Sequence, residues 1–182
     1  LRKFMRENNI SAYITYSTDP HSGEYVPSHW ESRKWITGFT GSAGTAAITL
    51  DDGGLWTDSR YFLQAEEQLD DTGLRLFKER IPGTPSIAQW LGSVLNKGEK
   101  VGFDGYTTSL QTVNELKDEL SAFGIEATMV PDPYAEIWEG RPELPDDKPF
   151  ILEEKYSGRS TTQKLSSIRE YLKDNVSDAI LI

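Results

Sequence analysis

Arg60 is the side chain in this sequence best placed to hold a ligand. It follows residues 56–58 (WTD) at the exit of an expected strand, where side chains emerge at the rim of a sheet. A guanidinium held beside the ring of Tyr61 can present its N–H groups to a peptide carbonyl or a carboxylate. A structural ion pair with Asp58 or Glu24 explains the same residue equally well, so both interpretations stay open.

A polar loop follows the strand expected at residues 10–16 and carries His21, Glu24 and Tyr25. Their side chains can border the same site as Arg60. A solvated loop explains them at least as well, because turn-forming residues surround them. The residues alone therefore make these three candidates for the edge of a binding site and nothing more.

The sequence gives little support for a metal-binding site or for a catalytic nucleophile. The chain has no cysteine, which excludes thiolate metal sites and a cysteine nucleophile. His21 and His29 are eight residues apart, a spacing that fits no pair of ligands on one helix face. Ser42 lies in GSAG, which is not the G-x-S-x-G elbow of a serine hydrolase. Acidic pairs are solvated at turns or exposed faces in most proteins, although an all-carboxylate site stays open here; the pairs are Asp51-Asp52, Glu66-Glu67, Asp70-Asp71 and Asp146-Asp147.

Gly38, Gly41 and Gly44 recur every third residue and invite a phosphate-binding interpretation. Their spacing matches neither the dinucleotide fingerprint nor a Walker loop, and they precede a strand, whereas an anion site uses a helix N-terminus. Tight turns that hold the backbone against a neighbouring element are the better explanation.

The composition of the 182 residues narrows the classes of partner. Acidic residues outnumber basic ones by 29 to 19, and the net charge of −10 repels phosphate backbones, so we expect no nucleic-acid partner. No apolar run approaches the ~20 residues that cross a bilayer, so no membrane partner is expected. The absence of cysteine permits a reducing, cytoplasmic location.

Strand and helix patterns alternate through the first 138 residues, which predicts an α/β fold. Residues 45–50 and 55–57 are expected to form a hairpin, with positive φ angles at Gly53 and Gly54, and this hairpin makes the sheet mixed. Asp58 or Ser59 is expected to cap the helix that begins near Tyr61. A later helix, opened by Thr108 or Ser109, should bury a leucine-rich face: Leu110, Val113, Leu116 and Leu120.

The end of the chain predicts the start of another domain. We expect a first domain at residues 1–138 and a proline-rich linker at 139–160. Residues 168–182 align with residues 1–15 without a gap, and an apolar strand is expected at 180–182. A helix that feeds a strand is a common pattern and also arises by chance. We nevertheless interpret residues 161–182 as the truncated start of a second, related domain.

Several motifs together resemble one family. They are DPHSGEY (19–25), R-x-x-x-x-GF-x-GSAGTA-x-IT (33–49), LWTDSRYFLQA (55–65), PDPYAEIW (131–138), RPELP (141–145) and YSGRSTTQKL (156–165). This set resembles the N-terminal domain of cytosolic-type Xaa-Pro aminopeptidases, members of the creatinase/prolidase metallopeptidases with a pita-bread catalytic domain. The likeness extends over essentially the whole chain.

The resemblance implies a mixed sheet flanked by helices with ribonuclease-H-like topology. Such enzymes have two related N-terminal domains and a catalytic domain that binds two divalent metal ions, often manganese. They release the residue that precedes proline in a peptide, and they form dimers. The metal ligands lie beyond residue 182, so the resemblance assigns no catalytic or metal-binding residue here and implies that this piece alone is inactive.

The resemblance also implies roles for three residues. Arg60 matches the arginine that contacts the bound peptide, and His21 and Glu24 match a segment near the substrate end of the cleft. The domain is expected to border the cleft and to support a homodimer. The alternative is a protein-binding module, because some histone chaperones carry a catalytically dead version of this architecture.

Overall fold

The computed structural model describes residues 1–181 and divides the chain into two units, Leu1–Pro145 and Asp146–Ile182. Each unit is described by itself. Among the described residues, no helix is both long enough and apolar enough to cross a membrane.

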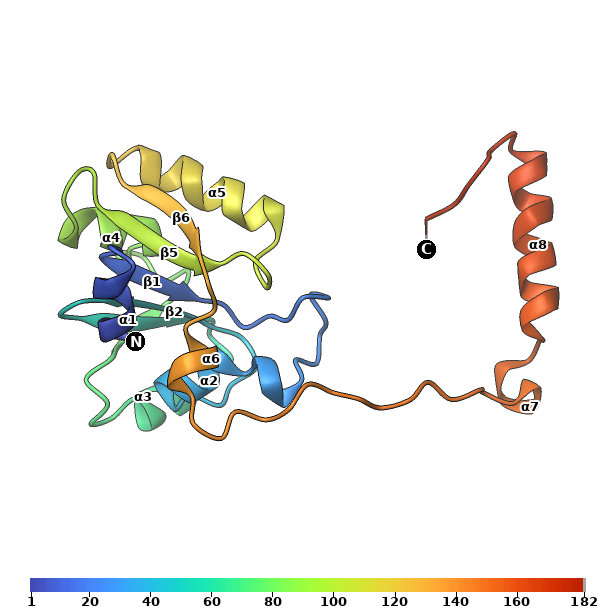
Figure 1. The fold of residues 1–182 in the computed structure, drawn as a ribbon, viewed down its shortest axis with the longest axis horizontal. Helices are drawn as coiled ribbons and strands as arrows, with labels where there is room; N and C mark the ends of the chain where they lie inside the picture. Colours follow the sequence, from blue (N-terminus) through green and yellow to red (C-terminus); the bar gives the residue numbers. More distant parts are fainter. Residues whose placement is uncertain (182) are drawn as a thin grey trace. The chain divides into compact units, whose positions relative to one another are not determined.

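The first unit is built on a six-stranded mixed sheet with the order β4-β3-β2-β1-β5-β6 (Figure 1). The strands are β1 (Ala12–Thr15), β2 (Thr45–Thr49), β3 (Gly53–Thr57), β4 (Arg75–Lys78), β5 (Lys100–Asp104) and β6 (Glu126–Val130). Strand β2 is antiparallel to both β1 and β3, whereas the pairs β1–β5, β3–β4 and β5–β6 are parallel. The mixed α/β sheet predicted from the sequence is therefore confirmed.

Helices cover both faces of this sheet. They are α1 (Arg2–Glu7), α2 (Ser32–Thr37), α3 (Phe62–Gln68), α4 (Ile87–Val94), α5 (Leu110–Ser121) and α6 (Tyr134–Ile137), with a 3₁₀ turn, η1, at Ser28–Trp30. Helices α4 and α5 lie on one face, and α1, α2, α3 and α6 lie on the other (Figure 1). Of these helices, α2 was not predicted from the sequence.

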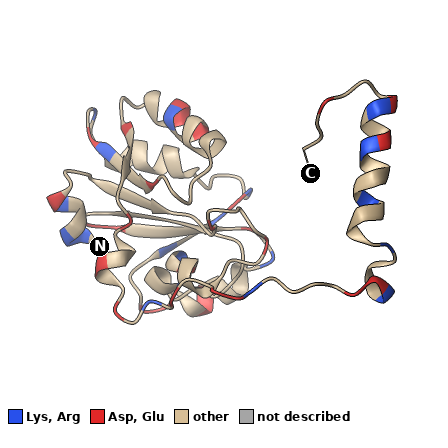
Figure 2. Cartoon of the chain, turned by 45° about the vertical axis from the view of Figure 1, so that its right-hand side comes forward, with Lys and Arg blue, Asp and Glu red and all other residues tan. Residues whose placement is uncertain are grey.

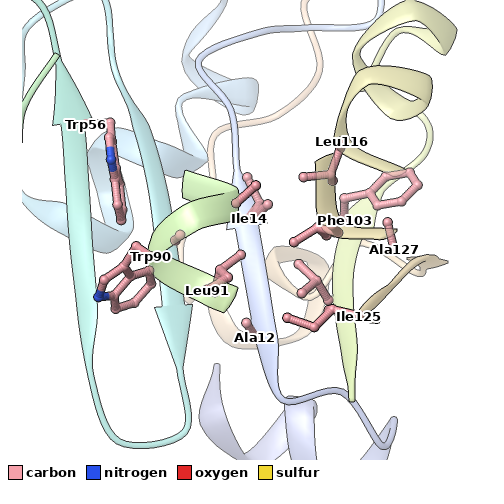
Figure 3. Packing of buried hydrophobic residues seen from close by; sticks show 13 residues of the cluster. Ala12, Ile14, Trp56, Trp90, Leu91, Phe103, Leu116, Ile125 and Ala127 are labelled. Carbon is pink, nitrogen blue, oxygen red and sulfur yellow. The ribbon is translucent and has the colours of Figure 1, made fainter. Parts of the chain in front are cut away.

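The larger core lies between the sheet and helices α4 and α5. Alternate residues of β1, Ala12 and Ile14, point to this face, as a side-chain period of two requires. Figure 3 shows Trp56 and Trp90 next to each other, with Ile14, Leu91 and Phe103 filling the centre of the cluster.

The opposite face buries two smaller clusters. Tyr13, between the two core residues of β1, packs with Met5 of α1 and Tyr134 of α6. Farther along the sheet, Leu55 packs with Phe39 and with Ala65 of α3. Tyr61, which follows Arg60 in the sequence, packs against this second cluster.

The glycines of the hairpin have a different role from the one predicted. Gly53 and Gly54 belong to β3, and neither has a positive φ, so the turn prediction is wrong for them. They lack side chains because the neighbouring strand leaves no room. A Cβ on Gly54 would lie 2.4 Å from Cε2 of Phe77, and one on Gly53 would lie 2.8 Å from Cδ2 of Leu74.

The predicted helix starts are partly confirmed. Ser109 caps α5, and Ser86 forms a reciprocal capping box with Gln89 at the start of α4. Helix α3 instead begins at Phe62, with Tyr61 at the N-cap position and no side-chain cap, so neither Asp58 nor Ser59 caps it. The carboxylate of Asp58 accepts hydrogen bonds from Arg60. On α5 the inward face excludes Leu110, which is 76% exposed, since this residue lies in the first turn beyond the edge of the core; Leu116 and Leu120 are buried as predicted.

The second unit contains α7 (Glu154–Ser157) and α8 (Thr161–Asp174), and α8 carries charges of both signs along its length (Figure 2). Ser160 and Gln163 form a capping box at its start. No residue of α8 is buried. The strand expected at 180–182 is not formed at Ile180 and Leu181, which have no strand paired with them, and Ile182 lies outside the described residues.

Candidate functional site

The candidate residues gather at one edge of the sheet. Strands β1, β3, β4 and β5 run in the same direction and end at this edge, and the antiparallel β2 begins there. The polar loop after β1, the turn after β3 and the glycine loop (residues 38–44) before β2 therefore meet at this edge (Figure 1). Ligands of open α/β sheets commonly bind beyond the carboxyl ends of strands.

Arg60 is held by its neighbour Asp58 and is still largely exposed. Its Nε and Nη2 donate to the two carboxylate oxygens of Asp58 at 2.9 and 2.7 Å, and its backbone N–H donates to the same carboxylate at 3.0 Å. The guanidinium also lies 5.2 Å from the centre of the Tyr61 ring. Of the two pairings open from the sequence, the structure forms the one with Asp58. The arginine side chain nevertheless remains 67% exposed, so the ion pair orients it without hiding it.

This pair also sets the charge at the sheet edge. The side-chain and backbone hydrogen bonds from Arg60 lower the pKa of Asp58 to about 2, and the Asp58 carboxylate raises the pKa of Arg60. Both groups therefore stay charged across the physiological pH range. The plane of the guanidinium at this edge is thereby fixed.

The loop after β1 begins with a side-chain turn. Asp19 is 4% exposed and accepts hydrogen bonds from the backbone N–H groups of His21 and Gly23, at 2.8 and 3.1 Å. The side chain of His21 is exposed. The turn chemistry predicted here is confirmed, and its buried aspartate fixes the direction in which the loop leaves the sheet.

A pocket of about 210 Å³ lies between this loop and the glycine loop. Its lining includes Glu24 and Tyr25 from the first loop, Gly41 and Ser42 from the second, and Arg33 from α2. His21 and Arg60 are not among its lining residues. Of the three residues predicted to bind substrate, Glu24 therefore borders a cavity, while His21 and Arg60 lie outside it.

Arg33 is a site residue that the sequence did not single out. Only 5% of it is exposed, and it donates from Nε to Ser17 Oγ at 2.8 Å and from its two terminal nitrogens to the carbonyl oxygens of Phe39 and Gly41. Burial lowers its pKa to about 10. One feature of the sequence could have indicated Arg33: it is the first residue of the motif that contains the three glycines. A charged residue in such a motif is often buried with hydrogen-bond partners instead of being exposed to solvent.

The glycines of this loop act as the sequence indicated, by close approach of the backbone. Gly38 ends α2 with a φ of 74°. A Cβ on Gly41 would lie 2.2 Å from the ring of Phe39, and one on Gly44 would lie 3.2 Å from the carbonyl oxygen of Trp56. The loop is thus packed against its neighbours.

Metal binding has no candidate site in residues 1–181, because these residues contain no group of three or more His, Asp or Glu side chains placed to hold an ion. A pair of divalent metal ions does not fit the residues present in this range.

Residues 1–131 match the Creatinase/Prolidase N-terminal domain family. The chain belongs to this family. It is 39% identical over its full length to Xaa-Pro aminopeptidase 1 of Dictyostelium discoideum and 37% identical to Xaa-Pro aminopeptidase 2 of Homo sapiens. It spans only 30% and 27% of the length of these two relatives, so they are more than three times as long.

Solved structures of family members have the same fold. The X-prolyl aminopeptidase of Caenorhabditis elegans, described as a cytosolic enzyme with a di-nuclear active site, superimposes with a TM-score of 0.79 at 32% identity. That match covers 93% of this chain and 28% of the worm enzyme. The N-terminal domain of a metallopeptidase from Corynebacterium diphtheriae superimposes with a TM-score of 0.53 at 21% identity, which supports the fold alone. The creatinase/prolidase fold predicted from the sequence is confirmed.

Proposed function

We propose that this chain is the non-catalytic N-terminal part of a metal-dependent Xaa-Pro aminopeptidase, where it borders the substrate cleft and supports a homodimer. One observation carries the proposal: relatives named Xaa-Pro aminopeptidase align with the whole chain, yet the chain spans less than a third of their length. The remainder of the protein then holds two divalent metal ions, with manganese as the expected metal. The worm relative's description supports a cytoplasmic location for the enzyme.

The expected substrate is a peptide with proline in second position. The bond before proline lacks an amide N–H, and the ring restricts the residue in front of it. An enzyme for this bond has to hold its substrate by carbonyl oxygens and by the chain termini. Exposed, oriented donors such as Arg60 supply that kind of contact.

Arg60 and Glu24 are given different tasks in this proposal. The guanidinium of Arg60, held in plane by Asp58, donates to a carbonyl or carboxylate oxygen of the peptide. Glu24 borders the pocket beside the glycine loop, which supports a place for it near the end of the proposed cleft. His21, exposed on the same loop, is proposed to flank that end of the substrate.

The organisation of the chain is proposed as a domain at 1–138, a linker at 139–160 and the start of a related domain at 161–182. The ends of α1 and α8 support this division. Asn8 and Asn175 each donate from the side-chain amide to the carbonyl oxygen four residues earlier, at 3.0 and 2.9 Å. The residues that follow, Asn9 and Val176, have φ angles of 53° and 49°. The aligned segments thus end their helices in the same way.

Activity measurements on two proteins test the proposal. The full-length protein should release the first residue of an X-Pro peptide when manganese is added, and chelation should abolish this release. The chain 1–182 should show no release under either condition. Turnover by the chain 1–182 alone would contradict the proposal that it is non-catalytic. A full-length protein that binds no metal would favour the protein-binding module instead.

A further inference from the structure

The buried guanidinium of Arg33 organises the glycine loop from within. Its donors reach the carbonyl oxygens of Phe39 and Gly41 and the hydroxyl of Ser17, and that hydroxyl donates to the carbonyl oxygen of Gly44 at 2.6 Å. One side chain thus fixes, directly or through Ser17, three carbonyl groups of a seven-residue segment that contains three glycines. Without these contacts glycine-rich backbone is free to adopt many conformations.

No carboxylate within residues 1–181 forms an ion pair with Arg33. A buried charge with only neutral acceptors is costly, and fixing the backbone of one short loop is the gain that offsets this cost. The planar fork of arginine can satisfy several acceptors at once, which the single ammonium of lysine cannot do in the same geometry.

The glycine loop is in turn bonded to the segment that carries Arg60. Thr57, fully buried at the end of β3, donates to the carbonyl oxygen of Ala43 at 2.7 Å. The hydroxyls of Ser42 and Tyr61 are hydrogen-bonded at 2.7 Å. These two bonds lie on either side of Arg60 in the sequence and join the turn after β3 to the loop that Arg33 holds.

A row of rings completes the connection between the two arginines. The guanidinium of Arg33 lies 4.9 Å from the centre of the Phe39 ring, which packs edge-on against Tyr61 at 5.9 Å. The other cation of the row, Arg60, lies 5.2 Å from the centre of the same Tyr61 ring. The order is cation, ring, ring, cation, so that a shift of the buried arginine displaces the ring on which the exposed arginine rests.

We infer that Arg33 is a positioning residue for the substrate contact made by Arg60, acting through the glycine loop and Tyr61. This inference rests on the proposed function of Arg60. It goes beyond that function because the position of the Arg60 guanidinium then depends on Arg33, a residue that the substrate does not contact.

A double-mutant cycle in the full-length enzyme tests the inference. Arg33→Lys keeps the charge and removes the fork, and we expect it to lower kcat/KM for an X-Pro peptide about tenfold. In an Arg60→Ala background the same substitution should change kcat/KM less than about twofold, because the group being positioned is gone. A general loss of stability would lower kcat/KM by the same factor in both backgrounds, and that result would overturn the inference.

A second variant keeps the test decisive if Arg33→Lys does not fold. Tyr61→Phe removes the hydroxyl that bonds to Ser42 but retains the ring, and it should show the same dependence on Arg60 with a smaller factor. The matched control is Arg75→Lys. Arg75 is exposed, pairs with Asp52 and lies at the opposite end of the strands, so this substitution is expected to leave kcat/KM unchanged within each background. If Arg60→Ala alone leaves kcat/KM unchanged, the proposed function of Arg60 is contradicted. If Arg60→Ala lowers kcat/KM, and Arg33→Lys lowers it by the same factor with and without Arg60, only the inference about Arg33 is contradicted.

Discussion

Arg141 donates a hydrogen bond from Nε to the main-chain oxygen of His29, 2.9 Å away, and so joins two positions 112 residues apart in the sequence. Its guanidinium lies 5.4 Å from the ring centre of Trp30 and 5.7 Å from that of Trp138. The first residues after α6 are thereby fastened to η1, which ends the loop that carries Glu24. The linker is thus anchored at its first residues.

This anchor predicts a stability effect for Arg141→Met, which keeps an apolar stem and removes the charge. Asp132 loses its partner, and we expect the free energy of unfolding to fall by about 1.5–3 kcal/mol, the range for hydrogen bonds to charged groups. Hydrogen exchange should become faster across η1. Arg159→Met, at an exposed position of the second unit, is the control. Unchanged exchange in η1 would show that the anchor does not restrain the loop.

Arg60→Ala in the full-length enzyme should lower kcat/KM for an X-Pro peptide by roughly ten- to a hundred-fold. This is the loss expected when a charge-assisted hydrogen bond of about 1.5–3 kcal/mol is removed from the transition state. The melting temperature should stay the same, because the side chain is mostly exposed. Arg75→Ala removes an arginine of similar exposure at the other end of the strands and should leave kcat/KM unaltered. Normal kinetics in a folded Arg60→Ala protein would reduce this residue to a partner of Asp58.

Gly54→Ala should destabilise the first unit by about 1–3 kcal/mol, because its methyl group would overlap the ring of Phe77. That ring is stacked on Trp56 with centres 4.0 Å apart, so tryptophan fluorescence should change as well. In a Phe77→Ala background the overlap with the ring is gone and only the 3.1 Å approach to the carbonyl oxygen of Arg75 remains, so the loss of stability should be clearly smaller. The free energy of unfolding is measured with urea. If Gly54→Ala lowers it equally with Phe77 and with Ala at position 77, the backbone conformation and not the ring is the reason for glycine at this position.

Two buried tyrosines, Tyr13 and Tyr134, and the partly buried Tyr16 predict a loss of stability at alkaline pH. Burial raises the pKa of Tyr16 to about 12, and it also raises the pKa values of Tyr13 and Tyr134. Their stabilising effect is complete below about pH 10, the ordinary value of the phenol, and is lost as the pH rises through the folded-state pKa values. In a titration followed at 295 nm, the absorbance of these three phenolates should appear together with the loss of circular dichroism. Ionisation of all three in a protein that is still folded would contradict the prediction.

Much of the architecture could be predicted because it depends on local rules. The alternation of β1, with Ala12 and Ile14 on one face and Tyr13 on the other, follows from its sequence. Ser109 was a recognisable cap for the same reason. The two glycines at the start of β3 misled the prediction, because glycine is required there by the side chains of Leu74 and Phe77 and not by the backbone angles of the glycines themselves.

The site was harder to predict because its residues are arranged by long-range contacts. The choice of Asp58 over Glu24 as the partner of Arg60 depends on which carboxylate the turn brings close. Helix α2 buries Ser32, Arg33 and Thr37, which in sequence look like a polar surface segment. Their burial becomes evident only when the glycine loop folds over them and offers its carbonyl oxygens.

The two outer strands of the sheet restrict how this domain can associate with other chains. Strand β4 is only four residues long and carries Arg75 and Lys78, and β6 carries Glu126 at its start. A strand of another molecule that paired with either edge strand would have to desolvate these charged side chains, which opposes extension of the sheet from one molecule to the next. Any association with another chain is therefore expected to use the helical layers, and the sheet itself remains six strands wide.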